Sequence, residues 1–143
     1  MSTHDPVALT QAYFAAWCRH DADAILACFA PGGTYRDPTT PGAIGGPELK
    51  GYAAALWTAF PDLNFEMGPV ERLEHHRTHT TWVMTGHNHG SLLGLPPTGK
   101  AVRIEGIDLI ETGPDGVRTV VGLFDSATLL RQMGMTVDIR PPA

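Results

Sequence analysis

The 143-residue sequence has little positive charge and no long apolar run. Its ten Lys and Arg are scattered and are outnumbered by 15 Asp and Glu, which gives a net charge of -5. Nucleic acids and anionic membrane surfaces bind clustered basic residues, so we expect neither as a partner. Because no apolar stretch approaches the length of a membrane span, we expect a soluble, cytoplasmic protein.

Cysteine and metal-ligand patterns are also scarce. Cys18 and Cys28 belong to no CxxC or comparable motif, so we expect reduced thiols in the core. His87 and His89 would project from the same face of a strand, as two metal ligands do. The downstream Glu and further His of a cupin site do not follow them. The sequence therefore predicts no metal site.

What the sequence does contain is a change of apolar periodicity part-way along the chain. Residues before Pro61 show helical spacing, with Asp5 and Pro6 as the start of a first helix. The patterns predict helices over about 6–20, 22–30 and 48–60, with a brief strand at 34–37. From Leu63 onward, short apolar segments indicate strands, and a short helix follows Asp125.

Helices followed by an antiparallel meander predict an α+β fold. We expect three N-terminal helices packed on a curved antiparallel sheet, with a short C-terminal helix. The length and the 43% apolar content predict a single domain over residues 1–143 that buries a core. Residues 1–4 and 135–143 are predicted to be flexible tails.

Two acids in apolar surroundings are the strongest candidates for chemistry: Asp108 in GIDLI and Asp125 in GLFDS. Burial raises the pKa of a carboxyl group, which makes it useful for proton transfer near neutral pH. Each has an alternative. Asp125 could cap the helix after it, which would lower its pKa, and Asp108 could be a hydrogen-bonded structural acid. If both face one pocket, their coupling would give an acid and base pair.

Several short motifs follow one another in a recognisable order. They are TyrArgAspPro (35–38), AlaPheProAspLeu (59–63), TrpValMetThrGlyHisAsnHisGly (82–90), LeuGlyLeuProProThrGly (93–99), GlyIleAsp (106–108) and LeuPheAsp with LeuLeuArgGlnMetGly (123–134). Over nearly its whole length the chain resembles the SnoaL-like polyketide cyclases, which belong to a wider group of cone-shaped α+β barrels with ketosteroid isomerase and limonene-epoxide hydrolase.

The resemblance implies a cone-shaped barrel and an intramolecular aldol ring closure that uses no metal or organic cofactor. The aspartate at the end of the last strand, Asp125 here, would be the general acid and base. From its apolar surroundings we expect Asp108 to assist it. The sequence departs from the family where members often carry proton-transfer partners. His87 and Asn88 replace a Thr-His pair, Val120 and Val121 replace a His-Trp pair, and Arg36 replaces a His.

We expect the barrel to bind a small, apolar, cyclic or polyketide-like molecule. The predicted substrate-binding residues are Tyr13, Trp17, Tyr35, Arg36, Trp82, His87 and Asn88. Isomerisation or epoxide opening in the same pocket, or ligand binding without catalysis, are alternatives. We also expect a homodimer through the outer face of the sheet, where Val83, Val102 and Val120 would need cover.

Overall fold

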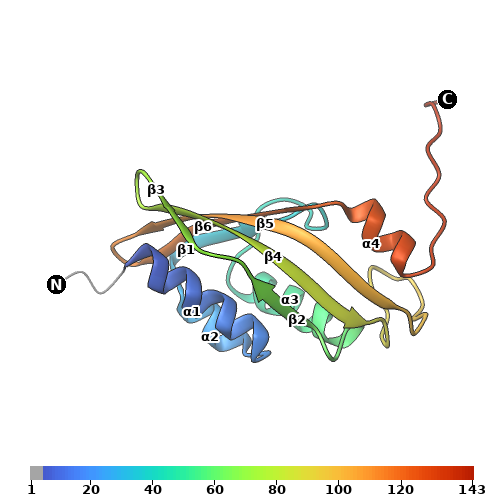
Figure 1. Ribbon diagram of the computed structural model, residues 1–143, viewed down its shortest axis with the longest axis horizontal. Coiled ribbons are helices and arrows are strands. Elements are labelled where there is room, and N and C mark those ends of the chain that lie inside the picture. The colour runs from blue at the N-terminus through green and yellow to red at the C-terminus, as the bar shows by residue number, and fades with distance from the viewer. Residues whose placement is uncertain (1–4) are drawn as a thin grey trace.

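The computed structural model describes residues 5–143, so the tail predicted at 1–4 lies outside the described residues. Among residues 5–143, four helices and six strands follow one another, with five of the strands in succession after α3 (Figure 1). Their bounds are α1 Pro6–Cys18, α2 Ala22–Ala27, β1 Phe29–Arg36, α3 Pro47–Ala59, β2 Asn64–Met67, β3 Glu71–Leu73, β4 Arg77–His87, β5 Ala101–Gly113, β6 Gly116–Phe124 and α4 Ser126–Gln132. No helix among residues 5–143 is both long and apolar enough to cross a membrane.

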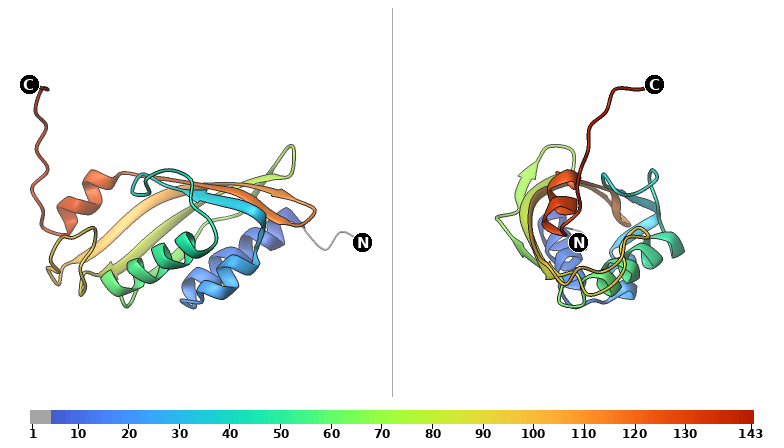
Figure 2. Two further views of the ribbon diagram at one scale, coloured as in Figure 1. Left: turned by 180° about the vertical axis from the view of Figure 1, so that it is seen from behind. Right: turned by 90° about the vertical axis from the view of Figure 1, so that its right-hand side faces the viewer.

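The sheet has the order β1-β6-β5-β4-β2, and β3 pairs with the first residues of β4. The expected α+β class is confirmed, but the sheet is mixed rather than antiparallel because β1 runs parallel to β6. Parallel neighbours need a crossover connection, and here the chain passes through α3 and the meander before it returns. The edge strands β1 and β2 do not pair, so the curved sheet stays unclosed, as the end-on view of Figure 2 shows.

Two helices begin as the sequence predicts. Oδ2 of Asp5 accepts from the backbone N–H of Ala8 at 2.9 Å, and Asp21 caps α2 in the same way through Ala24. The predicted end of the second helix is wrong, because α2 stops at Ala27 and β1 already begins at Phe29. The ProGlyGly stretch instead forms an irregular part of β1, where an edge strand tolerates proline.

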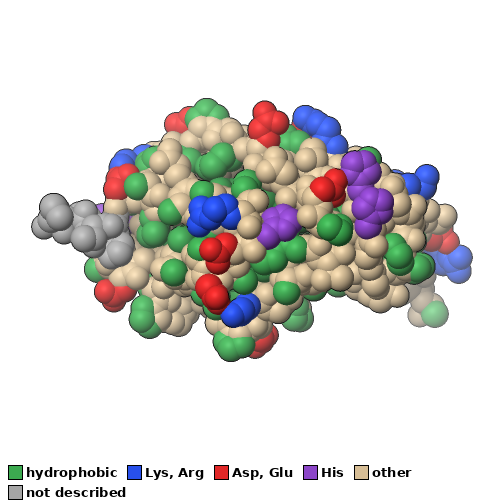
Figure 3. All heavy atoms as spheres, turned by 90° about the horizontal axis from the view of Figure 1, so that it is seen from below, with side chains coloured by type: hydrophobic (Ala, Val, Ile, Leu, Met, Phe, Trp, Pro, Cys, Tyr) green, Lys and Arg blue, Asp and Glu red, His purple; other side chains and the backbone are tan. Residues whose placement is uncertain are grey.

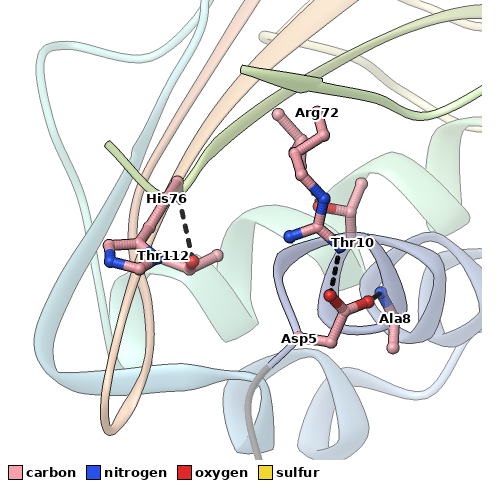
Figure 4. Close-up of polar contacts among 7 residues, drawn as sticks. Asp5, Ala8, Thr10, Arg72, His76 and Thr112 are labelled. Atoms are coloured by element: carbon pink, nitrogen blue, oxygen red, sulfur yellow. Dashed lines mark hydrogen bonds and ion pairs between the residues drawn. The ribbon is translucent and has the colours of Figure 1, made fainter. Parts of the chain in front are cut away.

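The end of the molecule near the N-terminus is held by polar contacts between elements (Figure 4). Arg72 of β3 pairs with Asp5, and the hydroxyl of Thr112 in β5 donates to the carbonyl of His76 at 3.0 Å. The opposite end carries α4 and the loop of residues 88–100 (Figure 1).

Side chains of the sheet alternate between a buried inner face and an outer face. Val102 and Val120, which the sequence analysis placed outside, are 3% and 1% exposed and point inward. Val102 shares the inner face with Asp108, because residues an even number apart on one strand point the same way. Val120 is paired with Ile110 of β5, which is also on that face. The outer face carries Leu109 and Leu123 instead, which are 41% and 47% exposed.

Candidate active site

A cavity of about 60 Å³ lies between the inner face of the sheet and helices α1 and α3. Eight aromatic residues line it, and the acids in its wall are Asp37 and Asp108. The aromatic residues are Tyr13, Phe14, Trp17, Tyr35, Tyr52, Phe65, Trp82 and Phe124. Leu92 and Leu93 bring the 88–100 loop to the wall, and Leu129 brings α4.

Asp108 is held in this wall by a neighbouring indole. Its side chain is 5% exposed, and the Nε1–H of Trp82 donates to its Oδ1 at 2.9 Å. Gly106, paired with Trp82 across β4 and β5, makes this possible: a Cβ built at Gly106 would stand 2.2 Å from the indole. The glycine thus serves the close approach of Trp82. Oδ2 of Asp108 accepts no hydrogen bond from residues 5–143, which leaves it free for a ligand.

The environment of Asp108 favours its protonated form. Burial raises its pKa from 3.8 to about 7, the hydrogen bond from Trp82 opposes part of this rise, and the negative charge of Asp37 adds to it. A carboxyl group with this pKa can both accept and donate a proton near neutral pH.

Asp37 is the centre of a second polar group. The hydroxyls of Tyr35 and Tyr52 both donate to its Oδ2 at 2.5 Å. The backbone N–H and the hydroxyl of Thr39 both donate to its Oδ1 at 2.7 Å. Four donors from β1, α3 and the loop after β1 thus converge on one carboxylate.

A glycine brings the two acids together. A Cβ built at Gly122 would stand 3.0 Å from Oδ1 of Asp108, 3.5 Å from Cβ of Asp37 and 3.6 Å from the hydroxyl oxygen of Tyr35. Gly122 lies in β6, between β1 and β5, and is paired with Asp108. The absence of a side chain there opens the space in which both acids face the cavity.

The three tyrosines of the cavity are neutral hydrogen-bonding groups. Burial raises the pKa of Tyr13 and Tyr35 well above the ordinary value. Burial and the charge of Asp37 raise the pKa of Tyr52 in the same direction. The cavity therefore combines a poised carboxyl group, a multiply bonded carboxylate and protonated phenols in an aromatic shell.

The profile of the SnoaL-like polyketide cyclase family matches residues 7–133. The chain belongs to this family. No curated protein matches the chain.

Solved structures with the same fold agree with this family membership. A candidate SnoaL-like polyketide cyclase from Jannaschia sp. CCS1 has a TM-score of 0.81 and 19% identity, with 93% of this chain and 94% of that chain covered. AclR, a candidate hydroxylase from Streptomyces galilaeus, has a TM-score of 0.79 and 21% identity. The match covers 94% of this chain and 84% of that chain. The third structure is a hypothetical protein with a ketosteroid isomerase-like fold from Catenulispora acidiphila DSM 44928, in complex with trimethylamine. It has a TM-score of 0.76 and 20% identity, with 93% of this chain and 97% of that chain covered.

In this SnoaL-like protein Asp125 lies outside the cavity, contrary to its predicted placement. Its Oδ1 accepts from the backbone N–H groups of Ala127 and Thr128 at 2.9 and 3.2 Å, and its Oδ2 accepts from the Thr128 hydroxyl at 2.9 Å. These bonds lower its pKa. Gly122 and Phe124 face inward, so the next residue points away. The acid that meets Asp108 is Asp37.

Sequence reasoning missed Asp37 as a site residue. Tyr35 and Asp37 are two apart along β1 and its end, and such residues share a face. That spacing was the available signal. Arg36, between them, is exposed on the opposite face and does not line the cavity.

The other predicted substrate-binding residues divide into two groups. Tyr13, Trp17, Tyr35 and Trp82 line the cavity, while their contact with a substrate stays a prediction. His87 and Asn88 do not line it, because β4 ends there and the chain turns.

His87 and Asn88 instead stabilise the chain around them. Nδ1 of His87 lies 2.6 Å from Oδ2 of Asp62 on the surface. Oδ1 of Asn88, fully buried, accepts from the backbone N–H of Thr98 at 2.9 Å, and its Nδ2 donates to the carbonyl of Gly90 at 2.9 Å. Asn88 therefore closes the base of the 88–100 loop.

No three His, Cys, Asp or Glu side chains among residues 5–143 come together as a metal site would require. The rings of His87 and His89 are stacked, with centroids 5.8 Å apart. On the face shown in Figure 3, Lys and Arg side chains stand among Asp and Glu rather than in one patch.

Proposed function

We propose that this SnoaL-like protein is an enzyme that transfers a proton at a carbon beside a carbonyl group, as an aldol-type ring closure requires. Asp108 is the group that carries the proton. The observation that supports this most directly is its position: a buried carboxyl group with a pKa of about 7 and one free oxygen, in an apolar cavity.

The reaction needs only one such group. Ionised Asp108 removes a proton from the acidic carbon through Oδ2, and the resulting enolate attacks a second carbonyl carbon of the same molecule. The new C–C bond leaves an alkoxide, which takes the proton back from Asp108. A pKa near the working pH suits both transfers.

Asp37 and its tyrosines set the electrostatics of this site. The charge of Asp37 raises the pKa of Asp108, which makes Asp108 the stronger base. Tyr35 and Tyr52 hold Asp37 in place from β1 and α3. A substrate oxygen beside Gly122 would meet a phenol hydroxyl and Asp108 within a short distance.

Isomerisation is the second candidate, since it uses the same proton transfer and returns the proton to another carbon. Epoxide opening is less well supported. An Asp-Arg-Asp arrangement would favour it, but Arg36 is exposed, and no Arg among residues 5–143 lines the cavity.

The test uses ethyl acetoacetate, whose carbon between two carbonyl groups is already acidic. Loss of its proton in deuterated buffer is followed by NMR for the wild type, Asp108→Asn and Asp125→Asn. We expect the wild type to accelerate exchange. The exchange rate should fall by roughly a hundredfold or more in Asp108→Asn and stay at the wild-type value in Asp125→Asn.

The wild-type rate should rise with pH through about 7, because the base is the ionised form of Asp108. Equal rates for the wild type and Asp108→Asn, or a loss confined to Asp125→Asn, would overturn the assignment of Asp108. A wild-type rate no higher than that of buffer would count against catalysis of this kind and in favour of simple ligand binding.

A further inference from the structure

The aromatic wall of the cavity is nearly continuous. Ring centroids of Tyr35 lie 6.4 Å from Trp17 and 5.6 Å from Tyr52, and those of Trp82 lie 5.4 Å from Phe65 and 5.9 Å from Phe124. Aromatic faces carry partial negative charge, and a cation enclosed by several of them is attracted more strongly than a neutral group of the same size.

The formal charges in the wall have one sign. The titratable residues that line the cavity are Asp37, Asp108, Tyr13, Tyr35 and Tyr52, and no Lys, Arg or His from residues 5–143 joins them. Asp37 is bound by four donors, whereas Asp108 has one free oxygen. A positively charged ligand would supply the counter-ion that the protein itself does not place beside Asp108.

The size of the cavity restricts this ligand. A volume of about 60 Å³ has room for a small group of several non-hydrogen atoms. A trimethylammonium or tetramethylammonium group has about this many non-hydrogen atoms.

We propose that the substrate carries a small methylated ammonium or protonated tertiary amine group, which lies between the aromatic rings and faces Asp108. This substrate class rests on the proposed function in using the same cavity. A positive nitrogen next to the reacting carbon also makes its C–H bond more acidic. The cation would therefore assist the proton transfer as well as binding.

The test compares tetramethylammonium with tert-butanol, a neutral molecule of nearly the same shape. Each is titrated into the whole protein at pH 8 and constant chloride concentration, and binding is followed by calorimetry and by the fluorescence of the tryptophans in the wall. We expect tetramethylammonium to bind at least about tenfold more tightly than tert-butanol.

Three variants locate the site. Asp108→Asn should weaken the binding of tetramethylammonium about tenfold and leave the affinity for tert-butanol unchanged. Phe124→Leu should also weaken the binding of tetramethylammonium, because one aromatic ring is lost. Asp125→Asn should bind as the wild type does. For the wild type, affinity for tetramethylammonium should fall as pH drops below about 7, because Asp108 becomes protonated while the ligand keeps its charge.

Equal affinity for the two ligands, or cation binding that Asp108→Asn does not weaken, would overturn this inference. The outcome is separate from that of the exchange experiment, because binding is measured without turnover. Exchange that depends on Asp108 without selective cation binding would leave the proposed function and remove the substrate class. Selective cation binding without exchange would support the cation site and remove the proposed proton transfer.

Discussion

Two aspartates in similar sequence surroundings have opposite properties in this protein. Asp108 is buried beside Trp82, and its pKa is raised to about 7. Asp125 is exposed at the start of α4, and bonds from Thr128 and Ala127 lower its pKa. The difference comes from the partners, because both are flanked by apolar residues along the chain.

We predict that the poised state of Asp108 reduces stability at neutral and alkaline pH. Its folded pKa lies above the ordinary 3.8, so the folded protein holds this proton more tightly than the unfolded chain does. The contribution of Asp108 to the free energy of unfolding therefore declines as pH rises from about 4 to above 7, by up to about 4 kcal/mol.

Urea unfolding of the wild type and Asp108→Asn at pH 5 and pH 8 measures this decline. The wild type should lose stability between the two pH values by more than Asp108→Asn does. Identical pH dependence in both proteins would contradict the raised pKa.

At the scale of elements, two side chains from the site prediction are structural. Asp125 caps α4, and Asn88 closes the 88–100 loop, so each fixes a segment that lies against the cavity. Capping residues and loop-closing amides are the same polar types that occur in active sites, which is why sequence alone did not separate the roles.

For α4 we predict a difference between two substitutions of Asp125. Asparagine is also a good cap, so Asp125→Asn should keep a thermal midpoint near that of the wild type, while Asp125→Ala should lower it. Because the pKa of Asp125 is lowered in the folded protein, its charged form stabilises the fold at pH values above its pKa in the unfolded chain. The gap between the wild type and Asp125→Ala should therefore shrink in acid, which thermal unfolding near pH 3 and pH 7 tests.

For the loop we predict that Asn88→Ala removes the hydrogen bonds to two backbone groups, the N–H of Thr98 and the carbonyl of Gly90. The backbone N–H of Thr98 would lose its acceptor, at a cost of about 0.5–1.5 kcal/mol. Hydrogen exchange of amides in residues 88–100 should become faster, with the exchange of β5 unchanged. Unaltered protection of the Thr98 amide would show that Asn88 does not hold the loop.

At the scale of the whole molecule, the outer face of the sheet is the surface that needs explanation. Leu123 is paired with Ile107, and Leu109 with Val121, so apolar side chains of adjacent strands gather there. We propose that a second copy of the chain covers them. The proposed homodimer thus uses the same face of the sheet as the sequence predicts, with Leu109 and Leu123 in place of Val102 and Val120.

Leu123→Arg should convert a dimer into a monomer, because a buried charge without a partner opposes association. Leu93→Arg, on the exposed 88–100 loop, is the matched control and should remain dimeric. Light scattering after size-exclusion chromatography distinguishes the two states. A monomeric wild type, or a Leu123→Arg protein that is still dimeric, would contradict the proposal.

The sequence by itself determined most of the helices and strands and one of the two acids of the site, Asp108. Helix caps such as Asp5, the change of period near Pro61, and the inward position of Asp108 follow from local spacing, which acts over a few residues. Tertiary structure decided which groups meet Asp108. Pairing β1 parallel to β6, on the side of β6 opposite β5, brings Asp37 across Gly122 to Asp108. No local pattern contains that information, because it depends on strand order and on the space that a missing side chain leaves.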